Sequence, residues 1–263
     1  MFHKSLIPNF FFSIFLTTTF TLSGITIPKE KAKQIGLKIW NNECAKSTSG
    51  LCSWNEGENF ASMGIGHFIW YHNNSEDPYE EQFPKLLTFL EENGVALPVW
   101  LTRSKTCPWC SRKLFLQDTQ REKITELRTI LVSTIDLQVI FMSERLEKAL
   151  PKILESAPSD KKQLIRTQFY RVAECPNGLY ALLDYINFKG EGSSSLERYK
   201  DQGWGLLQIL EQMSDSQKDT TMKDFVSAGK AVLMRRVANA PTERGEDRWL
   251  KGWFNRLDTY LTP

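Results

Sequence analysis

Apolar residues recur every three to four positions along most of this chain, a spacing that predicts amphipathic helices. Between residues 28 and 44, Ile35, Ile39 and Trp40 fall on one helical face, and Pro28 suits the first turn. The same periodicity predicts further helices at 79–93, 118–150, 159–174, 179–188, 204–213, 221–237 and 246–260. We expect Pro151 to end the long helix, because proline lacks the backbone N–H that continues one, and Ser159 to cap the next.

Residues 51–71 interrupt the helical pattern. Residues 51–54 and 60–71 are rich in apolar and aromatic side chains, and the polar stretch 55–59 between them is typical of a turn. This arrangement predicts a β-hairpin. The expected fold class is therefore α+β and mainly helical, with one small sheet near the start of the chain.

The first 24 residues have the pattern of a secretory signal peptide. Residues 1–5 are short and positive, residues 6–20 are apolar, and the small residues Ser23 and Gly24 follow. An uncleaved membrane anchor is the alternative, but the apolar stretch is shorter than the ~20 residues that span a bilayer. We therefore expect an exported protein, periplasmic or secreted, with no stable membrane insertion after cleavage.

The charge balance limits the classes of partner. The formal net charge is +2 over 263 residues, whereas nucleic-acid binding requires a concentrated basic face. A neutral polysaccharide remains compatible with this balance. No run of His, Cys, Asp or Glu has metal-ligand spacing, so neither a metal nor a cofactor is expected. The sequence leaves the oligomeric state open.

Glu43 is the leading candidate for a catalytic residue. It lies three residues after Trp40, on the apolar face of the first predicted helix. Burial and the helix C-terminus both disfavour a negative charge, so we expect its pKa to be raised. A carboxyl group that keeps its proton can act as a general acid. A solvent-facing glutamate at the helix end fits the spacing equally well.

The predicted hairpin supplies candidates for a second carboxylate. Glu56 and Glu58 lie in or beside its turn. An inverting glycosidase requires a second carboxylate ~6.5–9.5 Å from the acid, with a water molecule between them. Either residue is also compatible with a solvated turn carboxylate.

These residues together resemble the active-site segment of phage-type lysozymes. In that family a Glu ends the first helix and acts as the acid, a hairpin carboxylate positions water, and a Thr precedes Gly-Ile-Gly-His. Here Glu43 matches the acid, Ser62 stands in the place of the Thr, and residues 64–67 read Gly-Ile-Gly-His. This hairpin is longer than the family's, and Asn55 stands where its Asp is usually found. The resemblance leaves Glu56 and Glu58 as alternatives.

The resemblance extends to the C-terminal part of the chain. Residues 184–192, 206–210 and 241–253 are similar to the late helices and closing segment of that family. The chain also resembles uncharacterised bacterial exported proteins that share the stretch 53–58. The likeness implies one lysozyme-like domain over 25–263, with two lobes enclosing a groove. It assigns no role to the extended helical middle at about 79–174.

The implied activity is hydrolysis of the β-1,4 bond between N-acetylmuramic acid and N-acetylglucosamine in peptidoglycan glycan strands. A lytic transglycosylase is one alternative, in which the 6-hydroxyl of the sugar attacks in place of water. A non-catalytic envelope module that binds glycan or protein on a lysozyme scaffold is another. A Gram-negative periplasm is the expected location.

Several side chains are candidates to line the groove. Aromatic rings stack on sugar faces, which favours Trp54 and Tyr71 beside the hairpin. Gly64 and Gly66 leave room for a sugar to approach the backbone. The remaining candidates are His67, Gln208, Arg244 and Glu191. For each of these positions, core packing or a solvated surface is the alternative.

The chain has five cysteines, so at least one thiol is unpaired. Cys44 and Cys52 flank a short loop and are candidates for a disulfide. Cys107 and Cys110 form a Cys-x-x-Cys motif, which fits a local disulfide, two inert thiols or the redox pair of an exported thiol oxidoreductase.

Overall fold

The computed structural model describes residues 27–72, 79–102, 106–118, 121–195, 197–214 and 220–262. These residues form a mainly helical α+β structure with small antiparallel sheets, which confirms the predicted α+β, mainly helical class. The predicted signal peptide at 1–24 lies outside the described residues. Within those residues, no helix combines the length and apolar character needed to cross a membrane.

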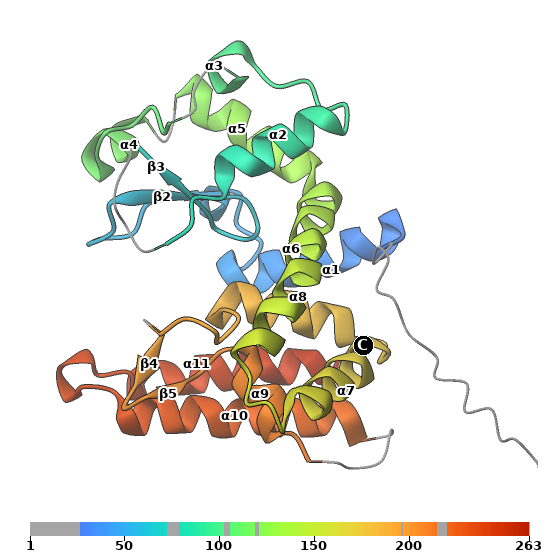
Figure 1. The fold of residues 1–263 in the computed structure, drawn as a ribbon. Coiled ribbons are helices and arrows are strands. Elements are labelled where there is room, and N and C mark those ends of the chain that lie inside the picture. The colour runs from blue at the N-terminus through green and yellow to red at the C-terminus, as the bar shows by residue number, and fades with distance from the viewer. Residues whose placement is uncertain are drawn as a thin grey trace, which may run out of the picture.

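Helix α1 (Lys29–Cys44) packs against α6 (Ile135–Ser156), the longest helix described, near the middle of the molecule (Figure 1). Ile35 and Ile39 are buried in this contact, as their spacing predicts. The helix ends after Cys44 because Ala45 adopts a left-handed φ of 49° and donates its N–H to Asn41. This ending places Glu43 in the last turn, beside the centre of the fold.

The predicted hairpin is a three-stranded antiparallel sheet of β1 (Cys52–Ser53), β2 (Phe60–Met63) and β3 (Phe68–Tyr71). Ser62 of β2 pairs with Ser53 on one side and Ile69 on the other. The expectation of one continuous strand over 60–71 is wrong. Residues 64–67 form a tight turn, in which Gly64 and His67 have φ values of 75° and 48°.

Helices α2 (Phe83–Glu92), α3 (Val99–Thr102), α4 (Arg112–Asp118) and α5 (Glu122–Ser133) lie on the same side of the molecule as this sheet (Figure 1). A short 3-10 turn (Ser49–Leu51) leads into β1. Trp70 of β3 packs against Phe83 and Trp109, with ring centroids 4.7 and 6.1 Å away. These aromatic contacts fix the sheet against the helical middle of the chain.

The single helix predicted over 118–150 is wrong in two respects. It is divided at Thr134, whose φ of −115° leaves the helical range and whose hydroxyl donates to Ile130. Pro151 lies inside α6 instead of ending it. Burial of Ile153 and Leu154 beyond the proline favours continuation to Ser156 over the cost of one missing hydrogen bond.

The opposite side of the molecule consists of the C-terminal helices (Figure 1). They are α7 (Lys162–Ala173), α8 (Gly178–Lys189), α9 (Leu206–Gln212), α10 (Thr221–Asn239) and α11 (Asp247–Asp258), with short 3-10 turns at Thr242–Arg244 and Thr259–Leu261. The predicted cap at Ser159 is wrong, since α7 starts at Lys162. Between α8 and α9 the chain contains the short strands β4 (Arg198–Tyr199) and β5 (Gln202–Gly203).

Candidate active site

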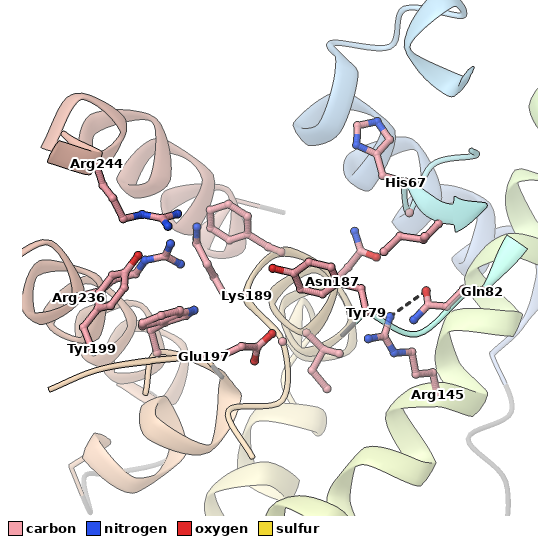
Figure 2. Close-up of a pocket in the computed structure, with 16 residues that line it drawn as sticks. His67, Tyr79, Gln82, Arg145, Asn187, Lys189, Glu197, Tyr199, Arg236 and Arg244 are labelled. Atoms are coloured by element: carbon pink, nitrogen blue, oxygen red, sulfur yellow. Dashed lines mark hydrogen bonds between the residues drawn. The ribbon is translucent and has the colours of Figure 1, made fainter. Parts of the chain in front are cut away.

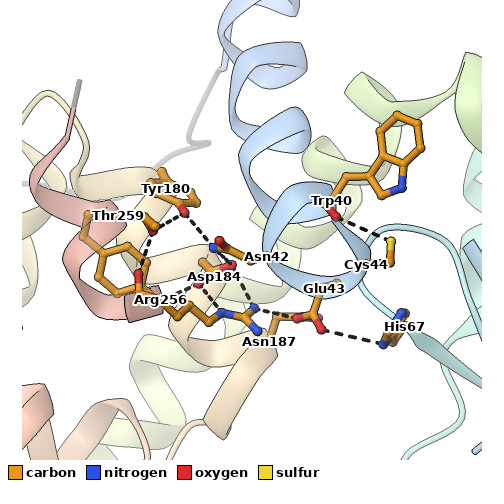
Figure 3. Close-up of polar contacts among 11 residues, drawn as sticks. Trp40, Asn42, Glu43, Cys44, His67, Tyr180, Asp184, Asn187, Arg256 and Thr259 are labelled. Carbon is orange, nitrogen blue, oxygen red and sulfur yellow. Dashed lines mark hydrogen bonds and ion pairs between the residues drawn. The ribbon is translucent and has the colours of Figure 1, made fainter. Parts of the chain in front are cut away.

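Glu43 is the centre of a polar network that joins three parts of the fold (Figure 3). Its side chain is 14% exposed. Asn187 of α8 donates to Oε1 at 3.1 Å, and Arg256 of α11 donates to the same oxygen at 2.5 Å. His67 Nδ1, from the turn before β3, lies 3.6 Å from Oε2. The carboxyl group is therefore held from the sheet side and from the C-terminal helices at once.

Arg256 is fixed by a second carboxylate, Asp184, which is fully buried in α8. The Nε atom of Arg256 donates to Asp184 Oδ2 at 2.8 Å, and its Nη2 atom donates to Oδ1 at 2.9 Å. Tyr260 donates its hydroxyl to Asp184 at 2.6 Å, and Asn42 donates to it at 3.3 Å. Such bidentate pairing orients the guanidinium group toward Glu43.

The expected direction of the Glu43 pKa shift is wrong. Burial raises this pKa, but the charge and hydrogen bond of Arg256, the nearby His67 and the Asn187 hydrogen bond outweigh it, so the pKa lies below its ordinary value. The spacing of apolar residues along α1 indicates that Glu43 is buried. It does not show the contact with Arg256, which is 213 residues away in the sequence. Glu43 is accordingly a carboxylate at neutral pH in the free protein.

A cavity of about 380 Å³ lies beside this network (Figure 2). Gly66, His67 and Ile69 line it from the sheet side, residues 186–190 line it from the end of α8, and Arg236 and Arg244 line it from the C-terminal part. His67 and Asn187 both line the cavity and contact Glu43. The Glu43 carboxyl group therefore lies directly behind the cavity wall.

Lys189 has the most unusual surroundings of the basic residues that line the cavity. Its Nζ atom lies 3.9 Å from the ring centre of Phe188 and 3.7 Å from that of Trp253. Burial, reinforced by Arg236 and Arg256, lowers the Lys189 pKa to about 6. The amine is therefore mostly neutral at pH 7, which is rare for a lysine and typical of functional sites.

A buried carboxylate organises the neighbouring arginines. Glu246 has a fully buried side chain, and Arg236 donates to its two oxygens at 2.8 and 2.9 Å. Arg244 donates to Glu246 at 3.1 Å, and Tyr199 donates its hydroxyl at 2.8 Å. This cluster holds α10, the turn before α11 and β4 together at one end of the cavity.

Glu197 and Arg145 complete the charged lining (Figure 2). Burial and the nearby Glu191 raise the pKa of Glu197. Arg145 donates to Gln82 at 3.2 Å. Glu197 is the one carboxylate among the described residues that line this cavity.

No protein-family model, curated protein or solved structure matches this chain. The likeness to phage-type lysozymes rests on the sequence alone, at Glu43, residues 62–67 and the C-terminal segments 184–192, 206–210 and 241–253.

The two carboxylates of the predicted hairpin, Glu56 and Glu58, are not among the described contacts of Glu43. Glu56 is exposed in the turn. Glu58 is half-buried and accepts a hydrogen bond from Asn55 at 3.2 Å. Neither Glu56, Glu58 nor Ser62, which is buried in β2, takes part in the described contacts of Glu43.

Gly66 and Gly64 have different surroundings. Gly66 lines the cavity, as expected of a substrate-binding position. Gly64 is buried at a φ of 75°, and a Cβ atom there would lie 2.5 Å from Gln138 Oε1. That oxygen accepts the backbone N–H of Ile65 at 2.9 Å. The space at Gly64 is therefore filled by Gln138 and not open to a sugar.

The other predicted substrate-binding residues divide into two groups. His67 and Arg244 line the cavity, whereas Trp54, Tyr71 and Gln208 are buried and do not. Trp54 donates its indole N–H to the Glu58 carbonyl, and Tyr71 donates its hydroxyl to the Tyr79 carbonyl. Gln208 accepts from the Gly205 N–H and donates to the Gly192 carbonyl. These three side chains hold the local backbone instead of facing the cavity.

Sequence reasoning missed Asp184, Asn187, Lys189, Glu197 and Arg256 as site residues. A usable signal was present in α8, where Asp184 and Asn187 lie three residues apart in an otherwise apolar helix. Polar side chains at that spacing share one face, and a polar pair on a buried face requires partners.

Neither candidate disulfide is present in this structure. Cys44, Cys52, Cys107 and Cys110 are free thiols. Burial raises the pKa of Cys107 to about 12. A redox-active thiol requires a lowered pKa, so the geometry does not favour a thiol oxidoreductase.

Proposed function

We propose that this protein cleaves the glycan strands of peptidoglycan at the β-1,4 bond between N-acetylmuramic acid and N-acetylglucosamine, with Glu43 as the proton donor. One observation carries the proposal: a mostly buried carboxyl group contacts two residues, His67 and Asn187, that line a cavity of about 380 Å³. Enclosed carboxyl groups of this kind are the groups that protonate a leaving glycosidic oxygen.

The low pKa of Glu43 sets a condition on this mechanism. A general acid must carry its proton when substrate is bound. A sugar that displaces water from the cavity adds desolvation, which raises the pKa of a carboxyl group. Arg256 keeps Asp184 as an anionic partner when Glu43 is protonated, so the guanidinium group is not left unpaired. We therefore expect the cleavage rate to rise toward mildly acidic pH.

Hydrolysis also requires a group that orients the attacking water. Glu197 carries the one carboxylate among the described lining residues, so the hydrolytic route assigns this role to Glu197. The resemblance to phage-type lysozymes instead assigns it to Glu56 or Glu58, assisted by Ser62. The Glu197→Gln, Glu56→Gln and Glu58→Gln variants separate these assignments, because the residue that orients water is the one whose loss slows hydrolysis.

A lytic transglycosylase is the second candidate. One observation favours it: neither hairpin carboxylate belongs to the described contacts of Glu43. That route requires a single carboxyl group, which acts first as acid and then as base. Its products end in a 1,6-anhydro sugar, whereas hydrolysis leaves a reducing end.

Clearing of purified sacculi by wild type, Glu43→Gln and Glu30→Gln tests the proposal. Glu30 is exposed in the first turn of α1 and provides a matched control. We expect Glu43→Gln to lower the clearing rate by at least about 100-fold, as for loss of a general acid, and Glu30→Gln to keep it. Wild-type protein that sediments with sacculi but never clears them would favour the non-catalytic envelope module.

A further inference from the structure

The cavity wall carries more positive than negative charge. Arg145, Arg236 and Arg244 line it together with the amine of Lys189, against the single described carboxylate of Glu197. Glu246 lies behind the wall with a fully buried side chain, where it pairs with Arg236 and Arg244. A neutral glycan requires no such excess of cations.

Three of these basic side chains gather at one end of the cavity. Figure 2 shows the side chains of Lys189, Arg236 and Arg244 directed toward one another, apart from His67 at the other end. Arg244 is about half exposed, with 51% of its side chain accessible. A ligand in the cavity can therefore reach this end from solvent.

Lys189 is half-buried, and its described contacts are with the rings of Phe188 and Trp253. The charged groups acting on it are Arg236 and Arg256, which disfavour its charge, and Glu246 and Glu43, which favour it. No described carboxylate lies within ion-pair distance of its Nζ atom, and the two aromatic rings beside it provide no lone pair. Because the amine lines the cavity and has no described carboxylate partner, the position is suited to a hydrogen-bond acceptor that arrives with the ligand.

We propose that Lys189, Arg236 and Arg244 form a subsite for a carboxylate carried by the bound sugar, so that the substrate is an acidic glycan. The inference rests on the proposed function and specifies its substrate. N-acetylmuramic acid carries a lactyl carboxyl group on its ring, which is charged where no peptide is attached. With the scissile bond near His67 and Asn187, the subsite receives such a carboxylate at the opposite end.

Binding at this subsite is linked to proton uptake. An anion beside Lys189 favours the ammonium form, so the bound state has a higher lysine pKa than the value of about 6 in the free protein. At a pH between the Lys189 pKa of the free protein and that of the bound protein, binding is accompanied by uptake of about one proton per ligand. Below pH 5 the lysine is already charged and uptake by this group disappears.

Calorimetric titration of the Glu43→Gln variant, which prevents turnover, tests the inference. The ligands are a tetrasaccharide of alternating N-acetylglucosamine and N-acetylmuramic acid with free lactyl groups, its methyl amide, and chitotetraose. Each is measured at pH 8 in two buffers of different ionisation enthalpy, which reveals proton uptake. The lysine variants are Lys189→Met and, as a control on the exposed face of α11, Lys251→Met.

We expect the acidic tetrasaccharide to bind at least about tenfold tighter than its methyl amide, as for one charge-assisted hydrogen bond. In Lys189→Met the preference should weaken, since Arg236 and Arg244 remain, and the proton uptake should vanish; both should persist in Lys251→Met. Equal binding of the acid and the amide would overturn the subsite and leave the proposed function intact. Failure of all three glycans to bind would overturn both.

Discussion

Glu43 shows how a distant partner can reverse a local electrostatic argument. Its position in α1 predicts burial and hence a raised pKa. Arg256 belongs to α11, and its hydrogen bond to Glu43 lowers the pKa instead. The sequence contains both residues, but nothing in their spacing shows that Asp184 directs this arginine to this glutamate.

The Asp184–Arg256 pair should set the pH dependence of activity. Replacing both partners, Asp184→Asn with Arg256→Gln, avoids leaving one buried charge unpaired. Loss of the guanidinium group removes the largest cause that lowers the Glu43 pKa, so the pKa rises. We expect the pH at which sacculus clearing is half-maximal to move upward by about one unit.

The exposed pair Lys230–Asp258, 2.6 Å apart between α10 and α11, provides the control. Replacing it as Lys230→Gln with Asp258→Asn should leave the pH profile in place. An unchanged profile in the Asp184/Arg256 double variant, with circular dichroism showing a folded protein, would remove Glu43 from the role of acid.

Lys189 should reduce stability at neutral pH. Its pKa is about 6 in the folded protein and 10.5 as the reference value for an unfolded chain. Between these values the unfolded state binds the extra proton, so stability rises with pH across that window. Lys189→Met removes this cost, and its melting temperature should exceed that of wild type at pH 6 by about 4 °C or more.

The difference in melting temperature between Lys189→Met and wild type should shrink as the pH approaches 10, because the lysine is then becoming neutral in the unfolded state as well. Differential scanning fluorimetry at pH 6, 8 and 10 measures the trend. A variant that melts below wild type at pH 6 would mean that Lys189 has a partner that stabilises its charge in the fold.

At the level of elements, a helix with a regular apolar face is predictable from the sequence, whereas interruptions of helices and strands are not. Helix α1 was predicted at 28–44 and lies at Lys29–Cys44, since its apolar face and ending follow local rules. The break at Thr134 and the continuation through Pro151 depend on tertiary packing, which buries Ile135, Ile153 and Leu154. The turn at 64–67 was missed because its glycines were interpreted as open space for a sugar.

Gly64 should be intolerant of a side chain for reasons of packing. A Cβ at this position would lie 2.5 Å from Gln138 Oε1 and 3.1 Å from Phe68, in addition to the strain of a φ of 75°. We expect Gly64→Ala to lower the free energy of unfolding by about 3 kcal/mol in urea denaturation.

Gly57 provides a matched comparison, since its φ is 83° but no atom lies within 4 Å of a Cβ placed there. Gly57→Ala should lose only about 1 kcal/mol, the cost of the left-handed backbone alone. Equal losses in the two variants would show that the Gln138 contact contributes nothing.

At the level of the whole molecule, the site is assembled from segments that are far apart in sequence. Glu43 and His67 come from the N-terminal part, whereas Asn187 and Arg256 come from the C-terminal helices. Residues 43 and 62–67 were identified because they lie in one short stretch with a distinctive pattern. The partners from α8 and α11 were not identified, because single-sequence reasoning does not show which helices meet.

The position of the cavity also explains why two aromatic candidates, Trp54 and Tyr71, do not line it. Trp54 and Tyr71 lie at the ends of the predicted strands, next to loops, which favoured contact with a groove. In the folded molecule the side chains of Phe115 and Phe60 pack against them, while the cavity is on the side of the sheet that faces α8. The direction in which a strand presents its side chains decides this point, and only the sheet register reveals it.

Cleavage in oxygen-18-labelled water tests the central claim most directly. Sacculi are digested at pH 5 by wild type and by Glu43→Gln, and the released fragments are weighed by mass spectrometry. The account predicts fragments from wild type whose new reducing end carries one labelled oxygen, and none from Glu43→Gln. Unlabelled 1,6-anhydro ends would contradict hydrolysis, and labelled ends released equally by Glu43→Gln would contradict the role of Glu43.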